Sequence, residues 1–282
     1  MKTLFIGNRG GVLAEMLKQT DVVAIGAMSG TYLERDAILD GREYESISTY
    51  ADVIDFFDRY EADMIVSNGL PFILKASDIG ERPIVNIHPS FLPDLKGIDP
   101  VLGSILFERN AGATCHQIDA GIDTGPIISR VLIPYSEDLN ASLLYQLSFR
   151  AEAQAFTLAL ARNFEPEFEQ EDSPGLIYFS RRPESRILPF SEGIPACLRV
   201  LRAFDNRNQG ARFFTSGIEY QAHSGCASEN SFLRQEFSDA RNLEIVMVFE
   251  DTVVVKVGSD FLLLSEVPDA DSSLVGMRVE GR

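Results

Sequence analysis

The sequence predicts an open, mostly parallel α/β sheet followed by a smaller, β-rich C-terminal domain. Up to residue 163, short apolar runs alternate with stretches of helical period, as in a parallel sheet whose crossovers are helices. An acidic segment with two prolines, residues 164–175, then breaks both periods and is typical of a linker. Beyond it the apolar runs follow one another closely. We therefore expect domains at 1–163 and 176–282, joined by 164–175.

The first domain opens with an apolar run at 3–7 that ends in glycine. The turn GNRGG leads from it into an amphipathic stretch at 12–19. Further strands are expected at short apolar runs, and further helices where apolar residues recur every three or four positions. The expected strands are 21–28, 63–67, 84–87, 114–118 and 127–133, and the expected helices are 50–60, 100–109 and 141–163.

The second domain is expected to hold one helix, at 194–205, and several strands. Residues 213–222 and 243–267 are β-rich, with strand candidates inside the second stretch at 244–249, 252–257 and 261–264. We interpret this region as an α+β or β-barrel-like domain, whose strands are suited to forming a homodimer.

The excess of acidic residues limits the kinds of molecule that the chain can bind. A net charge of −17 at pH 7 repels phosphates, which argues against a nucleic-acid partner, although arginines concentrate between Arg181 and Arg212 in what we interpret as a mixed surface. Three widely spaced cysteines without a CxxC pair are typical of a reducing cytoplasm. No run approaches the roughly 18 apolar residues of a membrane span, and the N-terminus lacks a signal-peptide pattern.

The turn GNRGG at 7–11 raises the question of a dinucleotide site, because it follows a strand and opens a helix. Its spacing is not GxGxxG, and no acidic residue clearly ends a second strand. We interpret it as a tight β–α turn. The alternative, an NAD(P)-binding oxidoreductase, predicts that the protein binds NAD(P)H.

Polar residues stand at the end of the strand at 84–87, where packing alone would not place them. Asn86 and His88 are two positions apart, so their side chains project on the same side of the strand. In open parallel sheets the carboxyl ends of the strands form the ligand crevice. Asn86 and His88, followed by the loop PSFLPDLKG, therefore predict a functional site.

The local sequence does not decide whether two further residues, His116 and Asp123, belong to the site. His116 is either a second active-site group or a strand histidine satisfied by the core. Asp123 lies in a glycine-flanked loop, where aspartate is usually a turn residue bonded to its own backbone. Its functional alternative is a partner that raises the pKa of His88 and fixes its tautomer. The three scattered histidines lack metal-ligand spacing, so we expect no metal.

Together these residues resemble the folate-dependent formyltransferases. The resemblance rests on NIHPSFLPDLKG at 86–97, GATCH at 112–116 and DTGPII at 123–128, and it covers residues 60–135 well and the first 60 loosely. Residues 178–222 weakly resemble the start of the C-terminal domain that several members carry. The resemblance implies a Rossmann-like catalytic domain that transfers a formyl group from N10-formyltetrahydrofolate to an amine, with no metal.

The resemblance also implies roles for individual residues. Asn86 and a protonated His88 would donate hydrogen bonds to the oxyanion that forms when the amine attacks, while Asp123 would keep His88 charged and relay the amine proton. The folate pocket would involve NGLPFIL at 68–74 and the loop 119–123; for the apolar residues the plainer alternative is core packing. The residues implied for this pocket are Leu70, Phe72, Ile73, Leu74, Asp119 and Gly121.

The acceptor follows by elimination among the branches of the family. The acidity of the chain, with no basic residue from 163 to 175, disfavours tRNA. Glycinamide ribonucleotide transformylases need no C-terminal domain, and formyltetrahydrofolate hydrolases carry a regulatory domain ahead of the catalytic one. We therefore expect a cytoplasmic N-formyltransferase for a small amine, chiefly a nucleotide-linked amino sugar. Methionyl-tRNA and hydroxyornithine remain alternative acceptors, and a folate-binding module without activity is an alternative class.

Overall fold

The computed structural model of the chain describes residues 1–171, 173–206 and 209–281. The chain forms two compact units. The first unit comprises Met1–Val101, Asn110–Tyr135 and Tyr145–Phe179, and the second comprises Leu102–Arg109, Ser136–Leu144 and the chain from Ser180 onward. The expected linker, 164–175, therefore lies within the first unit. There the backbone amide of Ile127 donates to the Phe168 carbonyl at 2.9 Å, so this segment adds to the edge of the first unit.

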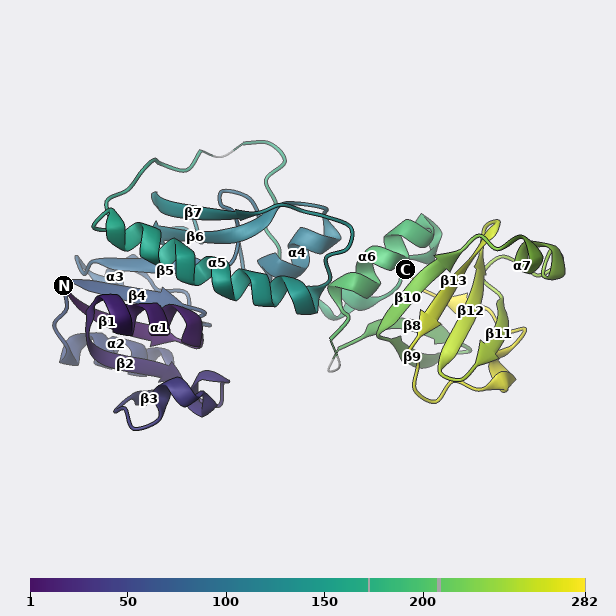
Figure 1. Cartoon of the computed structure of the whole chain (residues 1–282), viewed down its shortest axis with the longest axis horizontal. Helices are drawn as coiled ribbons and strands as arrows, with labels where there is room; N and C mark the ends of the chain where they lie inside the picture. The colour runs from purple at the N-terminus through teal and green to yellow at the C-terminus, as the bar shows by residue number, and fades with distance from the viewer. Residues whose placement is uncertain (172, 207–208, 282) are drawn as a thin grey trace. The chain divides into compact units, whose positions relative to one another are not determined.

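The first unit is built on a seven-stranded sheet in the order β3-β2-β1-β4-β5-β6-β7 (Figure 1). Pairing is parallel from β3 to β5 and antiparallel from β5 through β7. This confirms the predicted open, mostly parallel sheet. Its strands are β1 Lys2–Gly7, β2 Asp21–Met28, β3 Glu45–Ile47, β4 Met64–Asn68, β5 Ile84–His88, β6 Ala111–Gln117 and β7 Ile127–Ile133.

Five helices lie between residues 1 and 163, three of them shorter than the sequence predicts. They are α1 Gly10–Gln19, α2 Tyr50–Arg59, α3 Ala76–Ile79, α4 Pro100–Leu106 and α5 Ala141–Ala161. The expected helix at 100–109 ends at Leu106 because Glu108 takes a positive φ of 54°. The helix α5 ends before Asn163, which also has positive φ.

Helices cover both faces of the sheet, and the strand sequences reflect it. In β1, Leu4 and Ile6 pack with Phe56 of α2, whereas Phe5 faces the other way and packs with Met16 of α1. Successive strand residues point to opposite faces, so a strand covered on both sides is apolar throughout. The helix α2 begins at a capping box, in which Thr49 and Asp52 bond reciprocally to each other's backbone amides.

The second unit contains two antiparallel sheets, with strand orders β10-β13-β12-β11 and β14-β8-β9. Its helices are α6 Ile194–Ala203 and α7 Ser231–Glu236. Its strands are β8 Ala211–Thr215, β9 Ile218–Ala222, β10 Ser224–Ser228, β11 Ile245–Phe249, β12 Thr252–Val257, β13 Asp260–Ser265 and β14 Val279–Glu280. The predicted β-rich domain is confirmed, and the stretch 213–222 is resolved into a hairpin that turns at Gly217, where φ is +78°.

The helix α6 packs closely on β10, which is possible because that strand carries a glycine. A Cβ added to Gly225 would lie 2.5 Å from the Leu263 carbonyl oxygen of β13 and 2.8 Å from Cδ1 of Leu201. The Leu201 side chain is itself buried. The glycine thus lets the neighbouring strand and a side chain of the helix both approach β10 closely.

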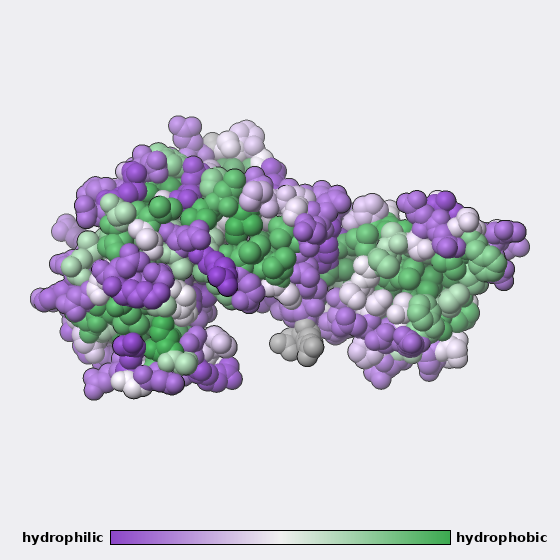
Figure 2. Space-filling model, in the orientation of Figure 1, coloured by the Kyte–Doolittle hydropathy of each residue, from purple (hydrophilic) through white to green (hydrophobic). Residues whose placement is uncertain are grey.

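Polar residues cover much of the visible surface of both units, with hydrophobic residues exposed in patches between them (Figure 2). No helix within the described part of the chain is both long and apolar enough to cross a membrane.

Candidate active site

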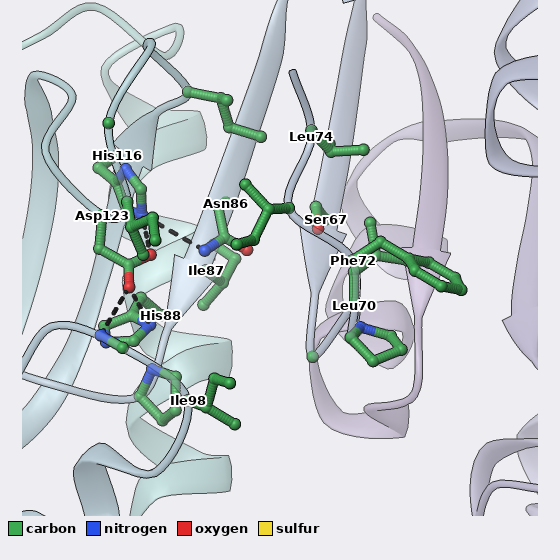
Figure 3. Close-up of a pocket in the computed structure, with 18 of the residues that line it drawn as sticks. Ser67, Leu70, Phe72, Leu74, Asn86, Ile87, His88, Ile98, His116 and Asp123 are labelled. Atoms are coloured by element: carbon green, nitrogen blue, oxygen red, sulfur yellow. Dashed lines mark hydrogen bonds and ion pairs between the residues drawn. The ribbon is translucent and has the colours of Figure 1, made fainter. Parts of the chain in front are cut away.

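The strand β5 places two polar side chains at the carboxyl end of the parallel half of the sheet. Val85 and Ile87 belong to the core on one face, and Asn86 and His88 lie on the opposite face (Figure 3). The antiparallel neighbour β6 then sets Asn86 directly opposite His116. The predicted shared direction of Asn86 and His88 is therefore confirmed, and the change from parallel to antiparallel pairing brings in a third side chain.

Asp123 lies between the two histidines. One carboxylate oxygen, Oδ2, is 3.6 Å from Nδ1 of His88, and the other, Oδ1, is 3.6 Å from Nε2 of His116 (Figure 3). Oδ2 also accepts from the Gly97 amide at 3.0 Å. The carboxylate thus faces the site rather than its own loop. Asp119 instead behaves as a turn residue, since its Oδ1 accepts from the Gly121 amide at 3.0 Å.

The proton positions on the two imidazoles follow from their acceptors. Nε2 of His88 lies 3.2 Å from the Leu95 carbonyl oxygen, so in the neutral ring Nε2 carries the proton and Nδ1 is the lone pair facing Asp123. Nδ1 of His116 lies 2.8 Å from the Gln117 carbonyl oxygen and must donate to it. Nε2 of His116 then accepts from the Asn86 amide nitrogen at 3.3 Å. His116 therefore orients the Asn86 carboxamide.

The pKa shifts of His88 and Asp123 set the charges of these two side chains before substrate binds. Burial lowers the pKa of His88, and the opposing effect of Asp123 does not restore it. Burial would raise the pKa of Asp123, but His88, His116 and the Gly97 amide together hold that pKa well below its usual range. Asp123 does raise the pKa of His88, as one interpretation of the sequence expected, but burial lowers it by more, so the protonated His88 that the resemblance implied is not the resting state. At neutral pH the imidazole is uncharged and the carboxylate is ionised.

The loop that carries Asp123 is held in place by its neighbours. Asp123 takes a positive φ of 53°, a conformation that a non-glycine residue keeps only when its surroundings favour it. Nε2 of Gln170 donates to the carbonyl oxygens of Asp123 and Gly125, at 3.0 and 2.7 Å. Gly125 approaches β6 so closely that an added Cβ would lie 2.0 Å from the Gln117 carbonyl oxygen. The Asp123 carboxylate is thus preorganised by backbone contacts.

These polar residues open onto a pocket of about 530 Å³. Every residue that the resemblance implied for folate binding lines it, and Leu70, Phe72 and Leu74 lie on the side away from His88, His116 and Asp123 (Figure 3). Those residues are Leu70, Phe72, Ile73, Leu74, Asp119 and Gly121. Leu74 is also part of the core, whereas Ile73 is 63% exposed, so the alternative of core packing fits the first residue and not the second.

The sequence analysis missed Arg9, which also lines the pocket. The GNRGG turn does form a tight β–α connection, because a Cβ added to Gly7 would lie 2.0 Å from the Asn68 carbonyl oxygen. The same turn directs Arg9 into the site, where its guanidinium lies 4.6 Å from the Phe149 ring and 4.0 Å from the Glu152 carboxylate. The position of this turn at the carboxyl edge of β1 was the available signal.

Within the described residues no group of three metal-ligating side chains is placed to hold an ion. The site therefore consists of a buried carboxylate, two imidazoles and a carboxamide beside a largely apolar pocket. Such a group provides a general base, a charge partner for it and an oxyanion donor, as expected of an enzyme that acts on a carbonyl group by acid–base chemistry.

Comparison with known proteins narrows this class. Residues 37–160 match the model of the formyl transferase family. The chain is 30% identical over 153 residues to the methionyl-tRNA formyltransferase of Hahella chejuensis, covering 52% of this chain and 48% of that protein. It is also 30% identical over 162 residues to the trifunctional purine biosynthetic protein adenosine-3 of Drosophila melanogaster, which covers 56% of this chain and 11% of that protein. The chain thus spans about half or less of these curated relatives.

Solved structures share the fold over nearly the whole chain. An N-formyltransferase from Helicobacter canadensis, in complex with folinic acid and dTDP-3-aminofucose, superimposes with a TM-score of 0.69 at 18% identity, covering 94% of this chain and 99% of that one. The sugar 3N-formyltransferase WlaRD gives 0.68 at 16% identity, covering 96% and 99%. Residues 37–160 are thus similar to the formyl transferase family, and the chain as a whole shares the fold of solved N-formyltransferases.

Proposed function

We propose that this protein transfers a formyl group from N10-formyltetrahydrofolate to the primary amine of a nucleotide-linked amino sugar. The observation that carries the proposal is the convergence of Asn86, His88 and Asp123 on one pocket at the end of β5. A formyl transfer needs a proton acceptor for the amine, a donor for the oxyanion and a proton donor for the leaving nitrogen. These three residues supply each of them.

The pocket suits the donor substrate by its size and its lining. A volume of about 530 Å³ lies within the usual range for a small-molecule site. Apolar side chains, among them Leu70, Phe72 and Ile98, line it on the sides away from the catalytic group. A planar pterin ring is bound by apolar faces, and the backbone groups at 69–74 provide hydrogen-bonding edges for it.

The resting state of His88 makes it the general base. Its Nδ1 carries the lone pair because Nε2–H is directed to Leu95, and its lowered pKa keeps it neutral at pH 7. Both His88 and Asp123, which lies 3.6 Å from this nitrogen, line the pocket. As the amine nitrogen bonds to the formyl carbon, Nδ1 takes the amine proton. The imidazolium that results is stabilised by the ionised Asp123, 3.6 Å away.

Asn86 stabilises the negative charge that develops on the formyl oxygen. One N–H of its carboxamide is directed to His116, which leaves the other N–H for the oxyanion. When the intermediate collapses, the bond between the formyl carbon and N10 breaks, and the His88 imidazolium returns its proton to N10. The proton lost by the amine is thus the one gained by tetrahydrofolate, and no covalent enzyme intermediate is needed.

Two observations favour an amino sugar as the acceptor. The solved structures that superimpose over nearly the whole chain include N-formyltransferases that act on nucleotide-linked sugars, according to their names. The net charge of −17 also opposes binding of a polyanion such as tRNA. Methionyl-tRNA is the second candidate, because the curated relatives at 30% identity are methionyl-tRNA formyltransferases.

The acceptor is tested by incubating the protein with N10-formyltetrahydrofolate and a panel of dTDP-, UDP- and GDP-linked amino sugars, with initiator methionyl-tRNA in parallel. We expect one sugar to gain the mass of a formyl group as tetrahydrofolate is released. Asn86→Ala should lower kcat by about a hundredfold, and Asn242→Ala in the second unit should not. Formylation of the tRNA with no formylation of any sugar would overturn the acceptor assignment.

A further inference from the structure

The second unit contains a cavity of about 380 Å³ that the proposed chemistry does not use. The described residues that line it are Arg181, Arg182, Pro183, Arg186 and Gln209. Three of the five are arginines and none is acidic. The sequence analysis interpreted this cluster as a mixed surface, but the structure gathers the three guanidinium groups around one cavity, in a chain whose net charge is −17.

The arginines around this cavity lie close enough to one another for their charges to interact. A fourth guanidinium, that of Arg212, lies behind Arg186 and pairs with Glu219. Burial lowers the pKa of Arg186, and the positive charges of Arg212 and Arg181 lower it further, while Glu219 offsets part of the shift. Like charges are held together here although they repel one another, and a bound anion would remove the repulsion.

The backbone around the arginines is fixed. Pro183–Arg186 form a 3₁₀ turn, in which the Ser185 amide donates to the Arg182 carbonyl at 2.9 Å. The segment is then joined to β8, where the Leu188 amide donates to the Arg212 carbonyl at 2.8 Å. Nη1 of Arg186 donates to the Gln209 carbonyl, which fixes this guanidinium. The segment backbone and one of the three guanidinium groups are therefore preorganised, and a fixed donor loses less entropy on binding than a mobile one.

We propose that this cavity binds the diphosphate group of a small phosphorylated molecule such as a nucleoside diphosphate. A planar guanidinium matches two phosphate oxygens, and several of them around one cavity match an anion with several oxygens and two or three charges. A cavity of this size admits the phosphate end of a small molecule. A nucleic-acid strand would instead require a stripe of basic residues along a surface, and the acidity of the chain opposes it.

The test is an isothermal titration of the full-length protein with inorganic phosphate, inorganic pyrophosphate and dTDP at low ionic strength. We expect pyrophosphate to bind more tightly than phosphate, and dTDP at least as tightly as pyrophosphate. Arg182→Gln, which removes a solvent-exposed guanidinium, should weaken both by about tenfold. Arg186→Lys should also weaken them, because it keeps the charge and loses the planar fork.

Arg241→Gln is the matched control, because Arg241 is an exposed arginine of the same unit that pairs with Glu244. We expect it to bind both ligands like the wild type, with thermal melting confirming that every variant is folded. Absence of pyrophosphate binding overturns the proposal, as does binding that Arg182→Gln leaves unchanged. Binding of a single-stranded oligonucleotide that pyrophosphate does not displace also overturns it. Under the proposed function dTDP also resembles part of the acceptor, so the loss of binding in Arg182→Gln, at this cavity alone, separates the two sites.

Discussion

The first unit buries two carboxylates whose pKa values shift in opposite directions. The Asp123 side chain is 12% exposed, and its pKa lies well below its usual range. The Glu152 side chain, on α5, is 1% exposed, and burial raises its pKa to about 7, with Arg9 offsetting only part of the shift. Burial acts in the same direction on both groups, so it does not explain the difference.

The difference lies in the partners of each carboxylate. Asp123 faces two imidazoles and accepts a hydrogen bond from the Gly97 amide. Neither oxygen of Glu152 has a hydrogen-bond partner among the described residues, and its one cationic neighbour, Arg9, is 4.0 Å away. A buried carboxylate keeps its charge beside a hydrogen-bond donor and groups that can become cations, and its charge is costly where these are absent or distant. Three substitutions and one pH profile test this comparison, and the substitutions are given in order of decreasing free energy.

Neutralising the well-partnered carboxylate should have the largest effect. Asp123→Asn keeps the shape of the side chain but removes the charge that stabilises the His88 imidazolium. We expect kcat/KM for formyl transfer to fall by about a thousandfold, which is about 4 kcal/mol of transition-state stabilisation. The matched control is Asp55→Asn on the exposed face of α2, which should keep wild-type activity. Near wild-type activity of Asp123→Asn would exclude the proposed role.

The same site gives a pH profile for the wild type. Because the folded-site pKa of His88 is lowered from 6.5, kcat/KM should be level near pH 7 and fall only in acid, as the base takes up a proton before the amine arrives. A fall that begins above pH 7 would contradict a neutral resting imidazole.

Neutralising the poorly partnered carboxylate should stabilise the protein. Glu152 has a folded pKa of about 7 and an unfolded pKa of 4.5, so the folded state binds more protons between these values and its stability falls as pH rises through them. Glu152→Gln should therefore raise the free energy of unfolding by up to about 3 kcal/mol at pH 8, and by little at pH 4.5. Denaturant unfolding at both pH values measures this difference.

The control for this prediction is Glu165→Gln, an exposed carboxylate just beyond the end of α5, whose effect should be small at both pH values. A stability gain from Glu152→Gln that is equal at pH 4.5 and pH 8 would show that packing, rather than the charge, is responsible.

Removing His116, the side chain that orients Asn86, should have the smallest effect on activity. His116→Ala takes away the acceptor that orients Asn86, so we expect kcat to fall by about tenfold with little change in the KM for the folate donor. His116→Gln keeps an oxygen that can accept from Asn86 and should restore part of the rate. Equal losses in the two variants would indicate that the imidazole acts only through packing.

The pair that we propose to be catalytic was predictable because its pattern is local. Asn86 and His88 share a strand end, and a polar pair at that position has no packing role, so the local sequence is enough to single them out. His116 was undecided, because its contact with Asn86 depends on the register between β5 and β6, which are joined by a long connection. Arg9 was missed because its partners, Phe149 and Glu152, come from a helix far along the chain.

In the second unit, too, features with a local pattern were predictable, and those that depend on a distant segment were not. The strand at 252–257 was predicted with its observed bounds, since its run of valines is typical of a buried strand. The strand β10, with the sequence SGCAS, was not predicted, because small and polar residues carry no strand signal. It forms by pairing with β13, whose apolar residues supply the sequence preference for both strands.

The contact of Gln170 with the Asp123 loop has a consequence for limited proteolysis. A cut in an ordinary linker separates two intact domains and leaves each with its activity. Here the acidic segment holds the carbonyls of Asp123 and Gly125 from outside the pocket. Cleavage just before Gln170 would free that clamp, and the loop would lose the restraint on its positive φ. Such a nick would inactivate the enzyme while every residue that lines the pocket remained in the same fragment.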